Sequence, residues 1–453
     1  MRRSGGVAYA GWVPVSIVDP ALAARVERAG RDVGLFASAR EVVVAGAPGR
    51  LDVFGGIADY SGATVLEWPL GVATAVGIAR RVDDRVVVHS SGATFATGID
   101  VLRAACEEGP AAVRRLVVRE SADWAAYVLG VLAIWWRQPG IALDGGFDIV
   151  VVSDVPAGAG VASSAALTVA CARAFADVLG VDRDPIPFAL DCQRVENEVV
   201  GAPCGAMDPV VVHCGEPGRL LRIRCQPAEI TGRVAPPRGW TFAGVDSGTR
   251  HSVAGAGYAR VRAAAFMGWQ MLAEIDGAPV VADAAGVPHI EHPAWGRWLA
   301  NVEPDAWRSR AARLPVECTG AEFVARHGRL IDPVSSLDDE ASHPVRAATA
   351  HPILENARIR EFEALLPHLD EPSIATRAGQ LMFASHASYT ICGLGSRETD
   401  EIVDAVREAG IAEGFAGAKI TGGGSGGTVA VLLREDALEA LRALVAPRPV
   451  LTA

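Results

Sequence analysis

The chain has almost no lysine. Lysine and arginine together account for 42 of its 453 residues, and the sequence contains a single lysine, Lys419. This scarcity excludes the GxxxxGK[ST] phosphate-binding loop, because that motif needs a lysine directly after its glycines. The near-complete use of arginine, together with many alanines and glycines, is typical of a biased genomic composition.

An excess of positive charge is also missing. The formal net charge is −11, whereas a nucleic-acid-binding protein needs a basic face. We therefore expect no nucleic-acid partner, and an anionic substrate would need a local positive site. Half of the residues are hydrophobic and 21% are charged, which is typical of a folded globular chain and not of a disordered one.

Long apolar runs and paired cysteines are absent too. The most apolar helix candidate, residues 124–136, is 13 residues long, which is too short to cross a bilayer. Residues 1–16 contain no apolar segment of a signal peptide. The eight cysteines form no CxxC pair, a pattern that favours buried, reduced thiols in the cytoplasm. We therefore expect a cytoplasmic protein without a membrane partner.

The length predicts two domains, since single hydrophobic cores rarely grow beyond about 250–300 residues. The Pro-Pro-Arg-Gly turn at 236–239 is the strongest break in the chain. We predict a leader at 1–40, an N-terminal domain at 41–237 and a C-terminal domain at 238–453. The composition of residues 277–345 is mixed, and we interpret this segment as an insertion or a partner surface.

Local patterns predict an α+β chain. Apolar, β-branched runs predict strands at 41–45, 71–79, 85–89, 147–152 and 241–245. Capping residues and helical spacing predict helices at 20–29, 121–136, 187–199, 258–275 and 356–389, the last with a break near 367–372.

The segment 154–167, DVPAGAGVASSAAL, is the most informative in the chain. It connects a predicted strand to a predicted helix. Gly158 and Gly160 let backbone amides approach an anion closely, and the helix start adds its dipole and free amides. The hydroxyls of Ser163 and Ser164 can reach a phosphate or its metal ion. The segment therefore predicts a phosphate cradle, although an ordinary strand–helix connection would have a similar composition.

Three other segments carry motifs: APGRLDVFGGIADY at 47–60, ENEVVGAPCGAMD at 196–208 and TGGGSGG at 421–427. With the segment 154–167 they resemble, in the same order, the motifs of the GHMP small-molecule kinases. The chain is most similar to galactokinases within that superfamily, and closest to their L-arabinokinase branch.

Shorter runs carry the finer resemblance. CGAMD at 204–208 and WAAYV at 124–128 are similar to galactokinase signatures, as is the stretch 247–262 with His251, Ser252 and Tyr258. GGIADYSG at 55–62 and PVRAATAHP at 344–352 resemble the L-arabinokinase branch.

The resemblance implies a two-domain GHMP kinase fold. Its N-terminal domain would be related to domain 2 of ribosomal protein S5, and its C-terminal domain would be ferredoxin-like. The active site would lie in the cleft between the domains. The implied reaction transfers a phosphoryl group from ATP, with Mg²⁺, to the anomeric hydroxyl of a monosaccharide.

The resemblance also implies roles for single residues. Asp208 would accept the proton of the sugar hydroxyl, and Arg50 beside it would stabilise the transferring charge. Ser164 and Glu196 would hold Mg²⁺, which prefers oxygen ligands. The expected nucleotide-binding residues are Pro156, Gly158, Gly160, Val161, Ala162, Ser163, Ser164 and Trp124. Ala162 stands where the family has its first loop serine, so the phosphate contact of that serine is not expected here.

The sugar-binding residues implied are Asp59, Gly56, Ile57, Gly205 and Tyr258. Galactokinases usually carry Glu-His where this chain has Gly56 and Ile57, near the exocyclic hydroxymethyl group of the sugar. Loss of those partners would leave a buried hydroxyl unpaired at a cost of about 1–3 kcal/mol, and Ile57 would add an apolar wall. L-Arabinose has the ring stereochemistry of galactose without C6, so it is the first candidate; galactose is the second, and a 6-deoxy sugar such as fucose also fits.

Structural interpretations compete with these roles. Asp208 could cap a turn, Arg50 and Glu196 could be surface charges, and Trp124 could be a core residue. The second glycine-rich segment could be a tight turn between domains. A non-catalytic sugar and ATP sensor with a protein partner is an alternative of another class. A decarboxylase of the same superfamily is disfavoured by the CGAMD run.

Overall fold

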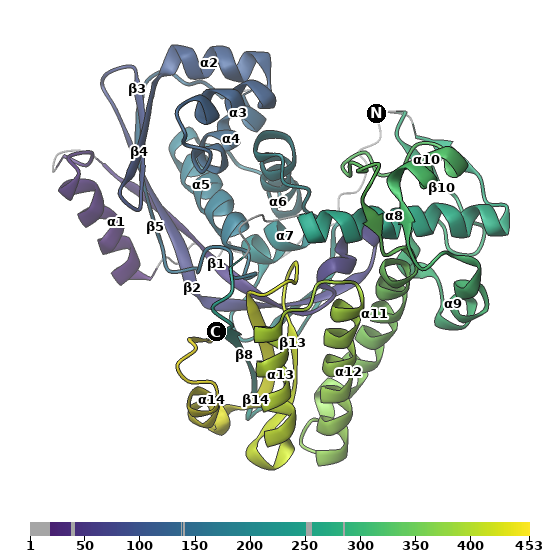
Figure 1. Cartoon of the computed structure of the whole chain (residues 1–453). Coiled ribbons are helices and arrows are strands. Elements are labelled where there is room, and N and C mark those ends of the chain that lie inside the picture. The colour runs from purple at the N-terminus through teal and green to yellow at the C-terminus, as the bar shows by residue number, and fades with distance from the viewer. Residues whose placement is uncertain (1–18, 38–40, 137, 139–140, 251–255, 284–285) are drawn as a thin grey trace, which may run out of the picture.

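The computed structural model describes residues 19–37, 41–136, 138, 141–250, 256–283 and 286–453. In this part of the chain, the two larger sheets follow one another along the sequence (Figure 1). The first has seven strands: β1 Val43–Phe54, β2 Thr64–Arg80, β3 Arg85–Ser90, β4 Ala93–Gly98, β5 Phe147–Ser153, β6 Leu220–Arg224 and β7 Glu229–Val234. The second has four: β8 Trp240–Asp246, β13 Phe415–Ile420, β14 Thr428–Arg434 and β15 Val450–Leu451.

The first sheet has the order β4-β3-β5-β2-β6-β7, and β1 pairs with β2 outside this path. Among these pairs only β3 and β5 run parallel. β2 is long enough to pair with three strands, β1, β5 and β6. β2 also contacts the second sheet near β15, where Gly71 N donates a hydrogen bond to Thr452 O at 2.8 Å.

Helices cover both faces of the first sheet. Alternate residues of a strand point to opposite faces, so Ala75 and Ala79 of β2 pack against α1 (Pro20–Asp32), while Val76 and Ile78 belong to the large core that includes α5 (Ser163–Leu179). Figure 1 shows α1 and α5 on opposite sides of the sheet. The other helices of this region are α2 Ile99–Glu108, α3 Pro110–Arg119, α4 Ala125–Trp135, α6 Pro185–Arg194 and α7 Met207–Cys214.

The second sheet is antiparallel, with the order β13-β14-β8-β15. Its core joins Ala243 and Val431 of the sheet to Ile402 and Leu441 of the helices that cover it. The helices of this region are α11 Val345–Leu365, α12 Pro372–Ile391, α13 Arg397–Ala409 and α14 Leu438–Leu444. The change from the first sheet to the second falls between Val234 and Trp240, at the turn singled out in the sequence.

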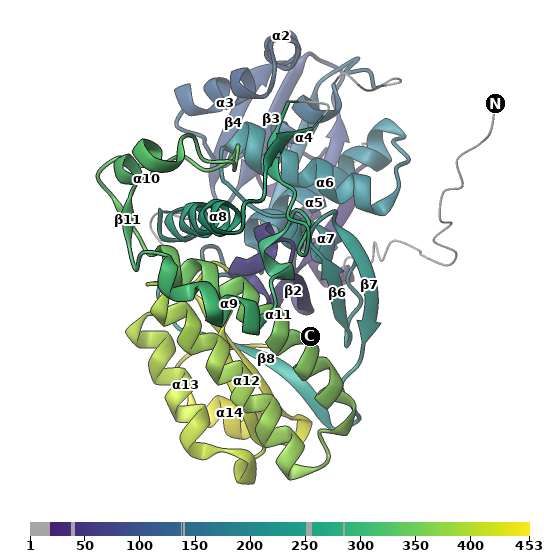
Figure 2. The same cartoon turned by 90° about the vertical axis from the view of Figure 1, so that its right-hand side faces the viewer.

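The segment 277–345, called the insertion below, surrounds the long helix α8 (Ala256–Asp276) (Figures 1 and 2). Its described part forms short strand pairs and two short helices: β9 Val280–Ala282, β10 Pro288–Ile290, β11 Cys318–Thr319, β12 Ser342–His343, α9 Pro304–Arg310 and α10 Gly320–His327. The core it shares with α8 contains several tryptophans, among them Trp269, Trp295 and Trp307.

Most predicted elements are present, and several are longer than the sequence patterns indicated. The strand expected at 41–45 continues to Phe54 through the Pro-Gly-Arg motif, and the one expected at 71–79 begins at Thr64. All eight cysteines are free, and seven of them are buried. Among the helices described, none is both long and apolar enough to span a membrane.

Candidate active site

Strand β1 supplies the basic group of the site. Arg50 and Asp52 lie two residues apart on β1, so their side chains project from the same face. The register between β1 and β2 shifts between Pro48 and Arg50 and again between Asp52 and Phe54. Such bulges re-aim side chains near functional sites, and here they flank the two charged residues.

The guanidinium of Arg50 connects the carboxylate of Asp208 with the loop that contains Gly160. Its Nε and Nη2 donate to Asp208 Oδ1 at 2.9 and 2.6 Å, and its Nη1 donates to the carbonyl of Gly160 at 2.7 Å. Asp208 lies in the first turn of α7, where the helix dipole favours a negative charge. Its side chain is 25% exposed and that of Arg50 only 3%, so the carboxylate faces the open side of the contact.

A cluster of buried charges lies behind Arg50. Glu67 of β2 is paired directly opposite Asp52, and Lys419 Nζ donates to Asp52 Oδ2 at 2.7 Å. Burial and the neighbouring Asp52 raise the pKa of Glu67 well above its usual range. Burial disfavours the charged form of Arg50, but Asp208, Glu67 and Asp52 outweigh it and raise its pKa. With Glu67 protonated, two carboxylates face two cations and the cluster is neutral.

Asp52 also connects the 56–61 turn with the second glycine-rich segment. Its Oδ1 accepts a hydrogen bond from Gly56 N at 2.9 Å, and its Oδ2 accepts from Tyr389 Oη and from Gly422 N, each at 3.3 Å. Its own amide donates to Thr421 Oγ1 at 2.6 Å. One buried carboxylate thus fixes the start of the 56–61 turn and the start of the second glycine-rich segment.

The loop between β5 and α5 has the geometry of an anion cradle. Gly158, Gly160 and Ala162 have φ values of 68°, 71° and 59°, a left-handed region that costs glycine little. Ala162 is the N-cap residue of α5 and makes no side-chain cap. Amides of the first turn, at Ser163 and Ser164, are therefore left for an external acceptor.

The second glycine-rich segment packs backbone to backbone against this loop. A Cβ atom at Gly422 would lie 2.7 Å from the carbonyl oxygen of Gly160, and one at Gly427 would lie 2.7 Å from that of Ala159. Thr428 Oγ1 adds a hydrogen bond to Ala159 O at 2.8 Å. Side chains at these glycines would push the two loops apart, which explains the composition of both motifs.

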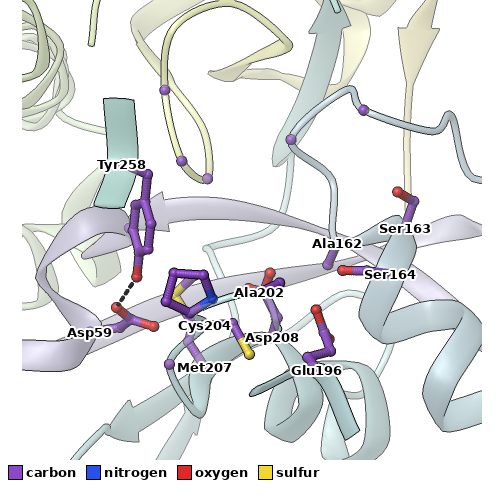
Figure 3. A pocket seen from close by; sticks show the side chains of 18 of the residues that line it. Asp59, Ala162, Ser163, Ser164, Glu196, Ala202, Cys204, Met207, Asp208 and Tyr258 are labelled. Atoms are coloured by element: carbon purple, nitrogen blue, oxygen red, sulfur yellow. Dashed lines mark hydrogen bonds between the residues drawn. The ribbon is translucent and has the colours of Figure 1, made fainter. Parts of the chain in front are cut away.

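Glu196 lies in a π-helical segment, Val195–Val200, at the end of α6; such segments are frequent at functional sites. Its side chain is buried and points toward Ser164 (Figure 3). Within the described part of the chain, Glu196 Oε1 has no hydrogen-bond partner. Burial and the charge of Asp208 raise the pKa of Glu196 to about 7, while Ser164 and Arg50 act in the opposite direction.

An unpartnered carboxylate oxygen beside a serine hydroxyl fits a hard cation such as Mg²⁺, which takes oxygen ligands and retains several waters. No group of three or more His, Cys, Asp or Glu side chains arranged to hold a metal ion is found among the described residues.

Asp59 lies in the short 3₁₀ turn Gly56–Ser61. Its Oδ1 accepts a hydrogen bond from Tyr258 Oη at 3.2 Å (Figure 3). A Cβ atom at residue 205 would lie 1.7 Å from Asp59 Oδ2, so this close approach requires Gly205. Burial raises the pKa of Asp59 to about 7, and the charge of Arg262 opposes this effect.

Gly56 presents only backbone to the cavity. A Cβ atom there would lie 1.7 Å from Tyr389 Oη and 2.5 Å from Asp52 Oδ2, and its φ of 32° is left-handed. The side chain of Ile57 is fully buried in the hydrophobic cluster that contains Tyr60 and Tyr389. Ile57 therefore does not form the apolar wall of the cavity that we expected from the sequence.

These groups line one cavity of about 370 Å³. Its walls bring together residues from the four main motif segments and from the stretch 247–262: Arg50, Gly56, Asp59, Gly158, Gly160, Ala162, Ser163, Ser164, Glu196, Gly205, Asp208, Tyr258 and the glycine-rich stretch 422–425. Four residues expected at the site do not line the cavity: Ile57, Trp124, Pro156 and Val161.

The positions of these four residues have local reasons. Trp124 is half-buried against the large core at the start of α4. Val161 belongs to the same core, and its carbonyl accepts a hydrogen bond from Arg50 N at 3.1 Å. Pro156 lies half-buried earlier in the loop. Two further residues of the sequence analysis, His251 and Ser252, lie outside the described residues.

Some cavity residues were missed from the sequence. Tyr127 lines the cavity one turn beyond Trp124, within the WAAYV run, and the sequence analysis did not single it out. Cys204 and Met207 of the CGAMD run also line it, as Figure 3 shows. Only the packing of α4 and α7 decides which side chains of these runs reach the cavity.

Comparison with known proteins agrees with this arrangement. The family model of the GHMP kinase N-terminal domain matches residues 126–216, and that of the GHMP kinase C-terminal domain matches residues 372–447. An L-arabinokinase of Arabidopsis thaliana is 37% identical over 453 residues, an alignment that covers 89% of this chain and 44% of the relative. The chain belongs to the GHMP kinase family.

Solved structures show the same two-domain GHMP kinase fold. The galactokinase of Lactococcus lactis complexed with galactose superposes with a TM-score of 0.68 at 18% identity, covering 94% of this chain and 93% of that one. The mevalonate kinase of Methanococcus jannaschii gives 0.53 at 14% identity, covering 92% and 98%. The chain spans less than half the length of its plant relative.

The raised pKa of Glu196 predicts a pH-dependent gain of stability for Glu196→Gln. The folded-state pKa, about 7, lies above the ordinary value of 4.5, so ionising this buried carboxyl costs the ligand-free protein about 3 kcal/mol above pH 7 and nothing below pH 4.5. Glu196→Gln should therefore stabilise the protein at pH 8 and not at pH 4.5, as measured by denaturant unfolding.

Glu198→Gln is the matched control, because Glu198 is on the same segment but exposed, in an ion pair with Arg194. It should change the free energy of unfolding by less than about 1 kcal/mol at either pH. Equal effects of the two substitutions at pH 8 would contradict the assignment of a strained carboxylate at Glu196.

The Asp52–Lys419 pair predicts a coupled effect on stability. Removing one partner of a buried ion pair typically costs about 3–5 kcal/mol, because the other charge is left uncompensated. Asp52→Asn and Lys419→Met should each destabilise by about this amount, and the double variant by clearly less than their sum. Additive effects in denaturant unfolding would show that the two charges act independently.

Proposed function

We propose that this GHMP kinase transfers the γ-phosphoryl group of ATP to the anomeric hydroxyl of a monosaccharide, giving sugar 1-phosphate and ADP. One observation carries the proposal. A single cavity contains the carboxylate of Asp208, which is bound to Arg50. The carboxylate of Asp59, which we propose binds the sugar, and the anion cradle at 158–164 line the same cavity.

Asp208 is the proton acceptor in this proposal. Its carboxylate is open to the cavity and is held by Arg50, so one oxygen can face the sugar hydroxyl that attacks phosphorus. As the O–P bond forms, the hydroxyl proton passes to Asp208 and the bond between the γ-phosphorus and ADP breaks. Arg50 supports this step by keeping Asp208 oriented and by placing positive charge beside the transferring group.

The cradle and the second glycine-rich segment hold the phosphates of ATP through backbone amides and the hydroxyls of Ser163 and Ser164. Glu196 and Ser164 would hold Mg²⁺, which supplies charge neutralisation for the phosphate oxygens when bound. Tyr127 lines the cavity, where burial and the nearby charge of Glu196 raise its pKa, and it is a better placed aromatic residue for the nucleotide than Trp124.

L-Arabinose is the first candidate for the sugar. Asp59 and Tyr258 offer hydrogen-bonding groups to ring hydroxyls. Gly56 adds no side chain to the cavity, because Tyr389 and Asp52 fill the space into which one would extend. A pocket without a polar side chain at this position suits a sugar without an exocyclic hydroxymethyl group. Galactose and a 6-deoxy sugar such as fucose are the alternatives.

Three further proposals concern the chain as a whole. We propose domain limits at 41–237 and 238–453, since the two sheets divide at the 236–239 turn. We also propose that the protein works in the cytoplasm. Because the chain corresponds to less than half of its plant relative, the activity is proposed for the chain described here.

A sugar panel tests the substrate. ADP release should be fastest with L-arabinose when L-arabinose, D-galactose, L-fucose and D-glucuronate are compared at equal concentration. Phosphorus NMR of the product should show a phosphate on the anomeric carbon. Turnover of galactose without turnover of arabinose would contradict the substrate and leave the reaction class intact, whereas no turnover with any sugar of the panel would contradict the proposed function.

Substitutions at the Arg50–Asp208 contact test the mechanism. Asp208→Asn should lower kcat by about 10²–10⁴-fold, since it removes a positioned proton acceptor while keeping its shape. Arg50→Ala should also lose most activity, and it should be less stable because Asp208 loses its cation. Circular dichroism checks folding. Asp404→Asn, on the exposed side of α13, is the matched control, and near-normal kcat for Asp208→Asn would contradict its role.

A further inference from the structure

The insertion is attached to the sugar side of the cavity by a buried ion pair. Arg262 of α8 donates from Nε to Asp332 Oδ2 at 2.8 Å and from Nη2 to Asp332 Oδ1 at 3.1 Å. Each residue is only 6% exposed. Ser335 Oγ donates a further hydrogen bond to Asp332 Oδ2 at 2.6 Å. The carboxylate is thus held by the insertion itself and presents a fixed acceptor to α8.

Arg262 in turn contacts the sugar-side residues. Its guanidinium lies over the ring of Tyr60, 5.5 Å from the centroid. The ring of Tyr60 meets that of Tyr258 edge-on at 5.9 Å, and Tyr258 donates to Asp59. The charge of Arg262 also acts on Asp59. A continuous path of contacts therefore leads from Asp332 to the carboxylate proposed to bind the sugar.

A second contact braces the same turn from outside. A Cβ atom at Gly62 would lie 2.6 Å from Trp298 Cβ, so the insertion closes directly over the end of the 56–61 turn. Ala300 is buried against Ala58 and Ala63. The space left along the seam near Trp298 amounts to about 10 Å³, room for at most one water molecule.

We propose that the insertion is an internal brace of the sugar site, in which Asp332 and Arg262 are positioning residues that set the affinity for the sugar. This inference rests on the proposed function. Asp332 accepts hydrogen bonds from both Nε and Nη2 of Arg262. These bonds keep the guanidinium from turning toward Asp59, where it would compete with sugar hydroxyls for the Asp59 carboxylate. The interpretation of residues 277–345 as a partner surface is not needed to explain these contacts.

Asp332→Asn tests the brace through kinetics. It should raise KM for the sugar by about tenfold or more and change kcat by less than about threefold, because it disturbs binding that ground state and transition state share. KM for ATP should stay unchanged. Arg262→Lys, which keeps the charge but only part of the hydrogen bonding, should give an intermediate rise in the KM for the sugar.

Asp276→Asn is the matched control. Asp276 also joins α8 to the insertion, through Arg310 Nε at 2.9 Å, but it lies fourteen residues further along the helix, about 21 Å away at 1.5 Å per residue. Asp276→Asn removes a second, less buried ion pair between α8 and the insertion without touching the 56–61 turn. If Asp276→Asn and Asp332→Asn raise KM for the sugar equally, the inference is overturned.

A second measurement is independent of turnover. Hydrogen exchange of the amides in residues 56–63 should become faster in Asp332→Asn and stay at the wild-type rate in Asp276→Asn. Unchanged exchange in Asp332→Asn overturns the brace, whatever the substrate is. A wild-type protein that phosphorylates none of the sugars tested overturns the proposed function instead, so the two failures are distinguishable.

Discussion

The site depends on the compensation of buried charge around Arg50. This arginine holds Asp208 toward the cavity, binds the carbonyl of Gly160 and lies against Glu67. Carboxylates are costly to bury, and two of them face each other across β1 and β2 because of the strand register. Two features reduce this cost. Arg50 and Lys419 supply positive charge, and the raised pKa of Glu67 favours its neutral form. Without that balance, β1 could not carry an arginine and an aspartate into the interior, and Asp208 would have no fixed orientation.

The remaining acidic groups of the cavity are not compensated to the same degree. Asp59 and Glu196 both have pKa values raised to about 7 by burial, so the ligand-free site is strained near neutral pH. A sugar hydroxyl at Asp59 and a cation at Glu196 would supply what these oxygens lack. The burial that raises these two pKa values therefore also explains why these carboxylates would bind such partners. The two glycine-rich loops add amides without side chains, which keeps the cavity open beside them while their backbones remain in contact.

Local sequence allowed much of the fold and site to be predicted. Apolar runs located β5 and β8, and helical spacing located α1 and α8, because these elements bury one face whatever their neighbours are. The glycines and serines of 154–167 indicated a cradle because left-handed turns and free helix amides follow from residue type. Local sequence could not show which of Trp124 and Tyr127 lines the cavity, or whether Ile57 does. Both aromatic residues are on one apolar helix, and only its packing against α5 and the π-helical segment decides which of them faces the cavity.

The sequence by itself determined the family, the α+β class, the order of the motifs and the residue types available for chemistry, since these depend on local spacing and composition. Tertiary structure alone decided that Arg50 meets Asp208 across 158 positions, that the single lysine neutralises Asp52, and that Asp332 of the insertion holds Arg262. Each of these is a contact between distant segments in a region closed to water. Its energy depends on burial and on the register of β1 with β2, and neither quantity can be obtained from residues close together in the chain.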